Sequence, residues 1–225
     1  MYAPVTEAET TFVEQFLPAY DVSDAVAVVV EADLETTWRA LLAVDLIEVG
    51  RRKPLVSLLG ALRALPDVVS QVLDGHLPVA PRQPMTLHEI AGMPLGDGGW
   101  TLLGERACEE IALGLVGRFW RPVIEYAEVD RDGFEAFDEP GYAKTVYSLS
   151  VRPLGERRTL LSGLMRTATT DEHARRWFRR YWTFGVGSGA HLLVAGLLEV
   201  AREDAERRSR AGSVEPSSAE PDGRV

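Results

Sequence analysis

The chain has 225 residues, of which 46% are hydrophobic and 26% are charged, and its formal net charge at pH 7 is −10. This length suffices for one large domain with a full core, and the composition is that of an ordinary globular protein. The acidic balance excludes general nucleic-acid binding, because that function needs a basic surface.

The first part of the chain predicts an arm, a strand and two helices. Residues 1–19 lack a clear period, and we expect an N-terminal arm there. Residues 24–32 form a β-branched run of strand length. Asp33 is a candidate N-cap for a helix over 34–44. Residues 54–73 carry a second helical pattern of apolar residues.

Six further strands are expected after a proline-rich connection. They are bounded by turn signals such as Asp97-Gly98-Gly99. The predicted strands cover residues 85–91, 100–106, 109–119, 122–129, 143–151 and 159–168. Short connections between consecutive strands favour an antiparallel meander, and a sheet of seven strands twists and curls.

A long helical run follows over residues 171–208. It opens on a capping-box pattern, Thr169-Thr170-Asp171-Glu172, and its apolar and small residues recur at spacings of three and four. An apolar stripe of this length needs a broad partner surface, so we expect the sheet to curve around this helix and leave a cavity between them. The apolar segment over 190–201 is shorter than the roughly 20 residues of a membrane span, so we expect a buried helix and no span.

Glycines interrupt this run at positions 185, 187 and 189. The segment from Gly185 to Ala190 fits the dinucleotide pattern G-x-G-x-x-A, but it follows a helical segment where a strand is required. Each helix-interior glycine costs up to about 1 kcal/mol relative to alanine. We therefore expect no nucleotide here, and a bend near Gly185 that shapes the cavity mouth.

The predicted fold is therefore α+β: a seven-stranded antiparallel curved sheet wrapped around a long C-terminal helix, with two helices after the first strand. Residues 1–19 are the expected N-terminal arm and residues 20–208 the domain. Residues 209–225 are rich in Ser, Pro, Glu, Gly and Ala, which predicts a disordered tail.

Three segments resemble a known superfamily. GLVGRFWRP at 114–122, EPGYAK at 139–144 and TDEHARRWFRRYW at 170–182 are similar to an uncharacterised bacterial branch of the START-like superfamily, also called Bet v 1-like, polyketide cyclase or SRPBCC. That branch often carries a Thr-Glu-Thr-Arg type segment on its last strand; here Arg166 matches and the acid does not. The resemblance implies a helix-grip fold around an apolar cavity. Members of the superfamily bind lipids, sterols, polyketides or hormones, and some catalyse cyclisation, aromatisation or hydrolysis.

The candidate ligand-binding residues are polar and aromatic side chains on elements beside the expected cavity. They are Arg118, Trp120, Lys144, Tyr147, Arg166, Tyr181, Trp182 and His88. An arginine in an apolar wall binds a carboxylate or phosphate, and a tyrosine orients or protonates a carbonyl. Alternatively, Arg118 and Lys144 lie on the outer sheet face in cross-strand pairs, and His88 is a surface or core histidine.

No residue pattern indicates a metal or a cofactor. The four histidines are scattered, and Cys108 is the single cysteine, so no intramolecular disulfide forms. We expect neither a metal nor a cofactor, and no catalytic residue is assigned. With no signal-peptide pattern at the N-terminus, we expect a bacterial cytoplasmic protein.

Three functions remain open. The first is binding of a small apolar or amphiphilic molecule, which predicts a cavity of at least about 300 Å³. The second is a cyclase- or aromatase-like enzyme, which requires an ionisable group in the cavity with a partner that tunes it. The third is a non-catalytic interaction or stress-response protein that docks through the arginines at 175–180. The sequence leaves the oligomeric state open.

Overall fold

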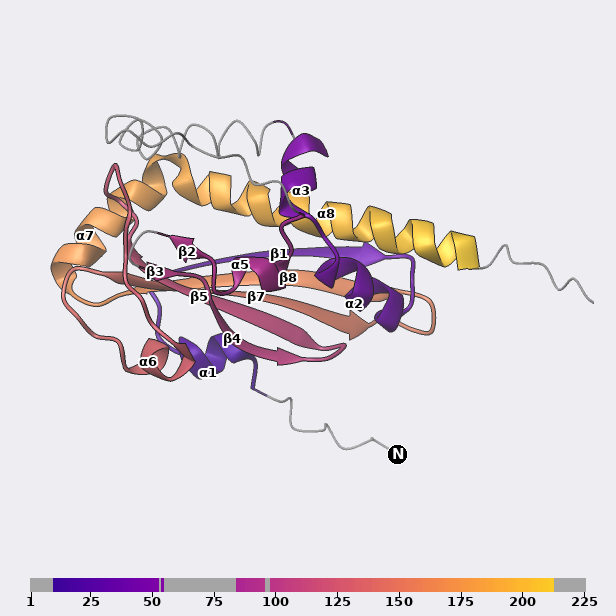
Figure 1. Ribbon diagram of the computed structural model, residues 1–225, viewed down its shortest axis with the longest axis horizontal. Helices are drawn as coiled ribbons and strands as arrows, with labels where there is room; N and C mark the ends of the chain where they lie inside the picture. Colours follow the sequence, from indigo (N-terminus) through magenta and orange to yellow (C-terminus); the bar gives the residue numbers. More distant parts are fainter. Residues whose placement is uncertain (1–9, 53, 55–83, 96–97, 213–225) are drawn as a thin grey trace, which may run out of the picture.

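The computed structural model describes residues 10–52, 54, 84–95 and 98–212 (Figure 1). Its elements in chain order are α1 (Phe12–Phe16), β1 (Val22–Val30), α2 (Leu34–Leu42), α3 (Leu46–Arg52), α5 (Leu87–Ile90), β2 (Pro94–Leu95), β3 (Gly98–Gly99), β4 (Thr101–Arg106), β5 (Glu110–Arg118), β6 (Glu125–Tyr126), α6 (Arg131–Ala136), β7 (Ala143–Pro153), β8 (Thr159–Thr169), α7 (Glu172–Tyr181), the π-helical turn η1 (Trp182–Val186) and α8 (Gly187–Gly212).

The main sheet has six strands, and every pair in it is antiparallel. Its order is β1-β8-β7-β5-β4, with β6 paired to the end of β5. The strands β4, β5, β7 and β8 form the expected meander, and β1 joins it beside β8. A separate two-stranded sheet pairs β2 with β3.

Helices cover both faces of this sheet. The long helix α8 runs across one face together with α2, while α1 and α6 lie against the opposite face (Figure 1). We call the first the helix side and the second the outer face. The alternation of side chains along a strand sends successive residues to the two faces. A single strand such as β5 therefore contributes to two separate cores.

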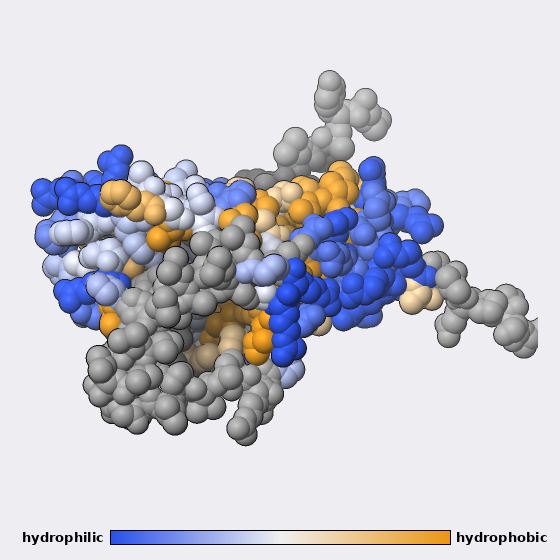
Figure 2. Space-filling model, turned by 90° about the horizontal axis from the view of Figure 1, so that it is seen from above, coloured by the Kyte–Doolittle hydropathy of each residue, from blue (hydrophilic) through white to orange (hydrophobic). Residues whose placement is uncertain are grey.

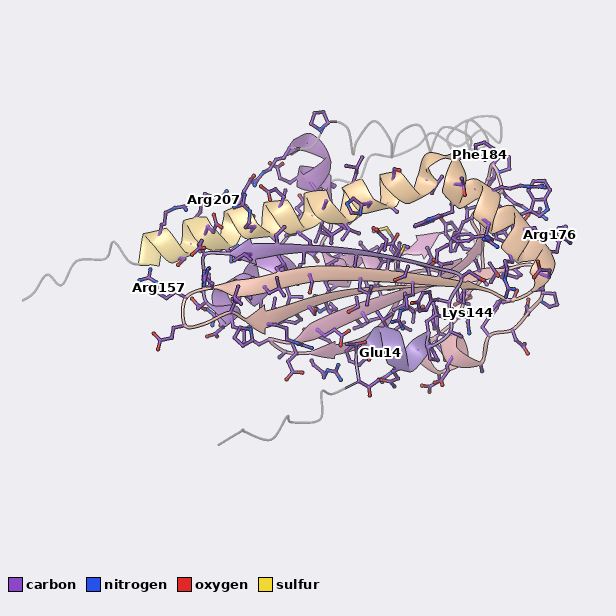
Figure 3. All side chains as sticks on the ribbon, turned by 180° about the vertical axis from the view of Figure 1, so that it is seen from behind. Glu14, Lys144, Arg157, Arg176, Phe184 and Arg207 are labelled. Carbon is purple, nitrogen blue, oxygen red and sulfur yellow. The ribbon has the colours of Figure 1, made fainter. Side chains whose placement is uncertain are left out.

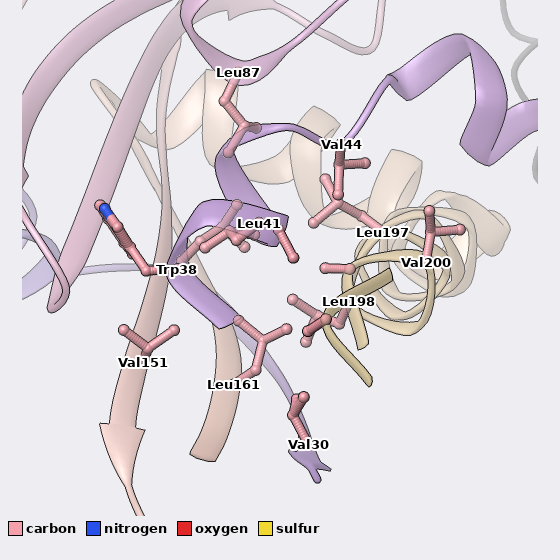
Figure 4. Packing of buried hydrophobic residues seen from close by; sticks show 14 of the residues in the cluster. Val30, Trp38, Leu41, Val44, Leu87, Val151, Leu161, Leu197, Leu198 and Val200 are labelled. Atoms are coloured by element: carbon pink, nitrogen blue, oxygen red, sulfur yellow. The ribbon is translucent and has the colours of Figure 1, made fainter. Parts of the chain in front are cut away.

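The larger core lies on the helix side. Leu41 of α2 and Leu198 of α8 are fully buried against Val30 and Leu161 of the sheet, and Trp38 is 4% exposed (Figure 4). These positions on α2 and α8 follow the helical spacing of three and four that the sequence shows. Their burial fixes where α8 crosses the sheet.

The expected bend in the terminal helix is confirmed. Gly185 adopts φ +106°, a conformation that favours glycine, and Phe184 also departs from helical geometry. The break separates α7 from α8, which lie at an angle to each other at this point (Figure 1). The sequence signal for the bend was the cluster of glycines inside a helical pattern.

The expected seven strands are not confirmed, because one predicted strand is a helix. Residues 87–90 form α5, and Thr86 and Glu89 cap it reciprocally: the Thr86 amide donates to the Glu89 carboxylate at 2.7 Å. The strand expected over 122–129 shrinks to the two residues of β6. A capping box starts a helix in the first case, and a turn follows β5 in the second.

The helices after β1 also differ from expectation. The helix predicted over 34–44 is α2, but the short helix α3 follows it unpredicted. The helix predicted over 54–73 lies almost wholly outside the described residues, so the expected pair of helices is not confirmed. The last helix runs on to Gly212, four residues beyond the predicted end at 208.

The helical run Glu172–Ala211 passes a length-and-apolarity test for a membrane span. One third of its most apolar window, 33%, is buried inside the protein, and a core helix of a globular protein passes the same test. The run also breaks at Gly185. The test is therefore weak support for a span.

Candidate functional site

A cavity of about 120 Å³ lies between the sheet and the bend of the terminal helix. Its walls come from both layers, and most of them are aromatic or aliphatic. The lining residues are Trp100, Leu115, Phe119, Thr145, Tyr147, Met165, Thr167, Phe178, Tyr181, Trp182, Val186 and Ala190. We call it the helix-side cavity. An apolar wall with a few polar groups is the usual composition of a ligand pocket.

The bend positions the helical wall of this cavity. Phe178, in the last turn of α7, stacks with Trp182, the first residue of η1. Their ring centroids are 5.9 Å apart. A Cβ at Gly187 would lie 2.7 Å from the Trp182 indole, so only glycine lets this ring pack against the start of α8. The glycines that break the helix therefore also place its aromatic side chains over the sheet.

The strand register positions the opposite wall. Asp24, Met165, Tyr147 and Leu113 are successive partners across β1, β8, β7 and β5. Cross-strand partners point to the same face of a sheet. This row therefore places Tyr147 at the floor of the cavity and the Asp24 carboxylate toward its β1 edge.

Tyr147 is a half-buried polar group at the floor of the cavity. Burial raises the pKa of its hydroxyl well above the ordinary value of 10.0, and the nearby Tyr181 and Asp24 add to the rise. Its ring meets Trp100 edge-on at 5.5 Å. Its hydroxyl makes no hydrogen bond to any described residue, so a protonated donor is available at neutral pH.

Two further hydroxyls lie on the sheet side of the cavity. Thr145 and Thr167 are cross-strand partners, and their Oγ1 atoms are 2.8 Å apart. One hydroxyl donates to the other, and each oxygen still has a lone pair that can accept a hydrogen bond from a guest. No charged side chain lines the cavity among the described residues.

A histidine–aspartate contact lies at the β1 edge of the same region. Nδ1 of His191, on α8, lies 3.0 Å from Oδ2 of Asp24. His191 follows Ala190, which lines the cavity, and Asp24 is the cross-strand partner of Met165, which also lines it. A carboxylate that orients an imidazole is a common acid–base arrangement. The pair joins α8 to the sheet edge beside the cavity.

A second hollow, of about 330 Å³, lies mainly on the outer face of the sheet. Its lining is small, and includes Ala25, Ala27, Ser148 and Ser162. At one end the buried Glu110 accepts hydrogen bonds from Ser148 Oγ at 2.5 Å, from Arg106 Nη2 at 2.6 Å and from the Phe12 amide at 3.1 Å. We call it the outer groove. Its size follows from short side chains on β1, β7 and β8.

The structure brings three of the eight predicted site residues into the helix-side cavity. They are Tyr147, Tyr181 and Trp182. Trp120 packs beside them, in the cluster that contains Phe119 and Phe178, without lining the cavity. The aromatic members of the predicted set therefore gather on one side of the sheet.

The three predicted cations lie on the outer face instead. Arg118 pairs with Glu125 at 2.8 Å and stacks on Tyr142. Lys144 donates to the Phe134 carbonyl at 3.2 Å (Figure 3), and desolvation lowers its pKa. Arg166 donates to the Leu17 carbonyl and covers the Tyr20 ring. The sheet therefore separates these residues from Tyr147.

His88 lies on α5, where its Nε2 is 2.7 Å from Glu105 Oε2. The side chain is exposed and does not reach the helix-side cavity. This placement agrees with the alternative of a surface histidine. The strand predicted over residues 85–91, which contains His88, is wrong, because Thr86 and Glu89 cap a helix there.

The cavity volume falls short of the expected 300 Å³. An engineered apolar cavity of about 150 Å³ holds benzene, so 120 Å³ matches a group of about one ring.

Within the described residues no cluster of three or more His, Cys, Asp or Glu side chains is placed to hold a metal ion.

Four residues in or beside the cavity are absent from the predicted set. Asp24 precedes a run of valines on β1. It alternates in step with Val26 and Val28, and this spacing could have placed its side chain on the helix side of the sheet. Thr145 and Thr167 were visible as inward polar positions on alternating strands. His191 carried no signal, because its partner lies 167 residues away.

Comparison with known proteins gives no family. No protein-family model matches the chain, and no curated protein matches its sequence. Among solved structures, a conserved protein from Geobacillus kaustophilus is 11% identical with a TM-score of 0.35, covering 83% of this chain and 96% of that one. A hypothetical protein from Helicobacter pylori is 10% identical with a TM-score of 0.36, covering 92% and 100%.

The Zhui aromatase/cyclase from Streptomyces sp. R1128 is also similar, at 14% identity and a TM-score of 0.31, covering 85% of this chain and 97% of that one. Similarities at this level carry no argument about function.

Proposed function

We propose that the protein binds a small, largely apolar molecule, or the apolar part of an amphiphile, in the helix-side cavity. The observation that carries this proposal is the composition of the walls: aromatic side chains from two layers enclose a few hydroxyls and no charge among the described lining residues. The free Tyr147 hydroxyl would donate to an oxygen of the guest. The volume suits one ring, so any larger ligand would extend beyond the cavity.

We further infer membership of the START-like superfamily. The order of elements supports it: a first strand and helices, an antiparallel meander, and a long terminal helix across the sheet. This order underlies the helix-grip resemblance seen in the sequence. The fold by itself does not select a ligand or a reaction.

The two hollows make the binding proposal testable with a matched pair of variants. Ala190→Phe places a ring in the helix-side cavity, and Ala27→Phe places one in the outer groove. Toluene and phenol serve as probes because they have nearly the same shape and differ in one hydroxyl. Binding is followed by nuclear magnetic resonance shifts of the backbone amides.

We expect both probes to shift amides around Tyr147 and Trp182 in the unmodified protein. Ala190→Phe should abolish these shifts, and Ala27→Phe should leave them unchanged. The opposite pattern, with binding lost only in Ala27→Phe, would move the site to the outer groove. Binding of neither probe by the unmodified protein would reject the proposal.

An enzymatic alternative rests on the Asp24–His191 pair beside the cavity. His191 would move a proton to or from a guest held near Tyr147, as a cyclase- or aromatase-like reaction requires. The discriminating variant is His191→Gln. If the unmodified protein converts the molecule that co-purifies with it and His191→Gln does not, the enzyme is supported. If both return it unchanged, binding alone remains.

A further inference from the structure

The outward side of α7 and η1 carries an exposed aromatic and cationic surface. His173, Arg176, Trp177, Arg180 and Phe184 recur at spacings of three and four, which places them on one side of the helical run. Trp177 is 46% exposed and Phe184 is 87% exposed. Arg176 and Phe184 stand at the same end of the molecule (Figure 3). We call these five residues the α7 outward face.

The exposed residues of the α7 outward face are not needed to pack α7 against the core. The inward side of α7 is complete, because Ala174 and Phe178 are buried and Phe178 stacks with Trp182. Burying a phenylalanine side chain stabilises a fold. Phe184 forgoes that contribution to the isolated fold, because the bend at Gly185 directs it outward.

The charges of the surface are largely unneutralised. Arg176, Arg179 and Arg180 are exposed, and none of them pairs with a carboxylate in the described part of the chain. The neighbouring Arg175 differs, since it pairs with Asp21 at 2.7 Å and with Glu172 at 3.1 Å. The Arg180 guanidinium lies 5.4 Å from the Trp177 ring centroid. A local positive surface therefore stands on a chain of net charge −10.

We propose that the α7 outward face docks on the surface of an anionic lipid bilayer. Arginines bind lipid phosphates, and each basic residue near an anionic surface strengthens binding by about fivefold. Tryptophan and phenylalanine favour the boundary between headgroups and acyl chains. The acidic remainder of the molecule is repelled by the same surface, which sets the orientation.

The shape of the surface favours a bilayer over an acidic peptide. Phe184 projects from a bend, and the described cavities are lined by neither Phe184 nor Trp177. A peptide docks in a groove with pockets for its side chains, whereas a projecting aromatic residue enters a fluid interface. Figure 2, which views the molecule from the α8 side, shows apolar patches along the middle of this side and strongly hydrophilic residues at both ends.

Docking would also bring the cavity to the lipid. Tyr181, Trp182 and Val186 line the cavity from the same short segment that directs Phe184 outward. An apolar guest would then pass between bilayer and cavity past the bend. This link rests on the proposed function, but docking itself does not.

The test is sedimentation of the protein with vesicles of phosphatidylcholine alone or mixed with phosphatidylglycerol. We expect binding to the mixed vesicles, little to the neutral ones, and weakening by added salt. The double variant Arg176→Gln/Arg180→Gln should bind at least about tenfold more weakly. Phe184→Ala should also weaken binding several-fold.

Matched controls exist at the other end of the molecule. Arg207→Gln/Arg208→Gln removes the same charge from exposed positions near the end of α8 (Figure 3). Leu154→Ala removes an apolar side chain that is 40% exposed. Both should leave vesicle binding unchanged. Equal losses in these controls, or tighter binding to polyglutamate than to the vesicles, would overturn the proposal.

The cavity-filled variant Ala190→Phe separates the two proposals. Vesicle binding should persist in it while toluene binding is lost. Vesicle binding that disappears together with toluene binding would tie the surface to the ligand site and contradict an independent docking face.

Discussion

At the scale of single residues, Tyr147 is the side chain most able to select a guest. It is a half-buried polar group at the floor of the cavity, and its hydroxyl makes no hydrogen bond to a described residue. A hydroxyl without a protein partner can donate to a guest, and such a hydrogen bond contributes about 1 kcal/mol. Tyr147 is therefore the residue expected to distinguish a guest with an oxygen from one without.

Tyr147→Phe tests this discrimination. The variant should bind phenol about fivefold more weakly, which is the value of one neutral hydrogen bond, and toluene about as well as before. Titrations followed by nuclear magnetic resonance give both affinities. An equal change for the two probes would show that Tyr147 acts through packing alone.

Tyr147 also predicts a pH dependence of folding. Because burial raises its pKa, the folded protein keeps the proton at pH values where the unfolded chain ionises. Its contribution to stability is therefore present below the ordinary pKa of 10.0 and declines as the pH rises above it. Urea unfolding should show a steeper loss of stability above this pH in the unmodified protein than in Tyr147→Phe. Identical slopes would contradict the assigned burial.

At the scale of elements, the bend between α7 and α8 organises the site. One segment directs Tyr181 and Trp182 toward the sheet and Phe184 toward solvent. The positive φ of Gly185 makes this arrangement possible. The helix caps act at the same scale: Asp171 accepts the Ala174 amide at 2.7 Å, and this bond lowers the pKa of its carboxyl.

Gly185→Ala tests the bend against a matched glycine. Gly155, in the turn after β7, has a similar positive φ of +82°, and neither position has an atom within 4 Å of an added Cβ. Both alanine variants should lose about 1–2 kcal/mol of unfolding free energy. Only Gly185→Ala should weaken toluene binding, since only Gly185 lies in the bend that positions Trp182 and Val186 of the cavity wall. Unchanged toluene affinity in both would show that the bend does not shape the site.

At the scale of the whole molecule, the helix α8 packs closely against the sheet. A Cβ at Gly163 of β8 would lie 2.6 Å from Val194 Cγ1 of α8, and Val194 is 8% exposed. This contact sets the spacing of helix and sheet next to the cavity. The spacing in turn sets how large a guest the cavity accepts.

A double-mutant cycle measures this contact. Gly163→Ala should destabilise the protein by about 1–3 kcal/mol through overpacking, and Val194→Ala by about 2 kcal/mol through a cavity. The double variant should lose less than the sum, because each change relieves the other. Thermal or urea unfolding provides the values. Simple additivity would show that the layers are not in contact there.

Local patterns predicted most of the elements, and they failed where a competing local signal was overlooked. Alternation along β7 places Thr145 and Tyr147 on one face and Lys144 on the other. Residue type alone had grouped Lys144 with Tyr147. In α5 the capping box of Thr86 outweighed the strand pattern.

Long-range pairing explains the rest of the site. The Asp24–His191 pair and the row from Asp24 to Leu113 depend on strand register and on where α8 crosses the sheet. Register is fixed by packing of the whole core. These contacts therefore required the structure.

The most direct test of the account is native mass spectrometry of the protein purified from its own host, beside Ala190→Phe prepared in the same way. The account predicts that a small apolar or amphiphilic molecule travels with the unmodified protein and is absent from the variant, with both proteins folded. A molecule retained equally by both would contradict the helix-side cavity as the binding site.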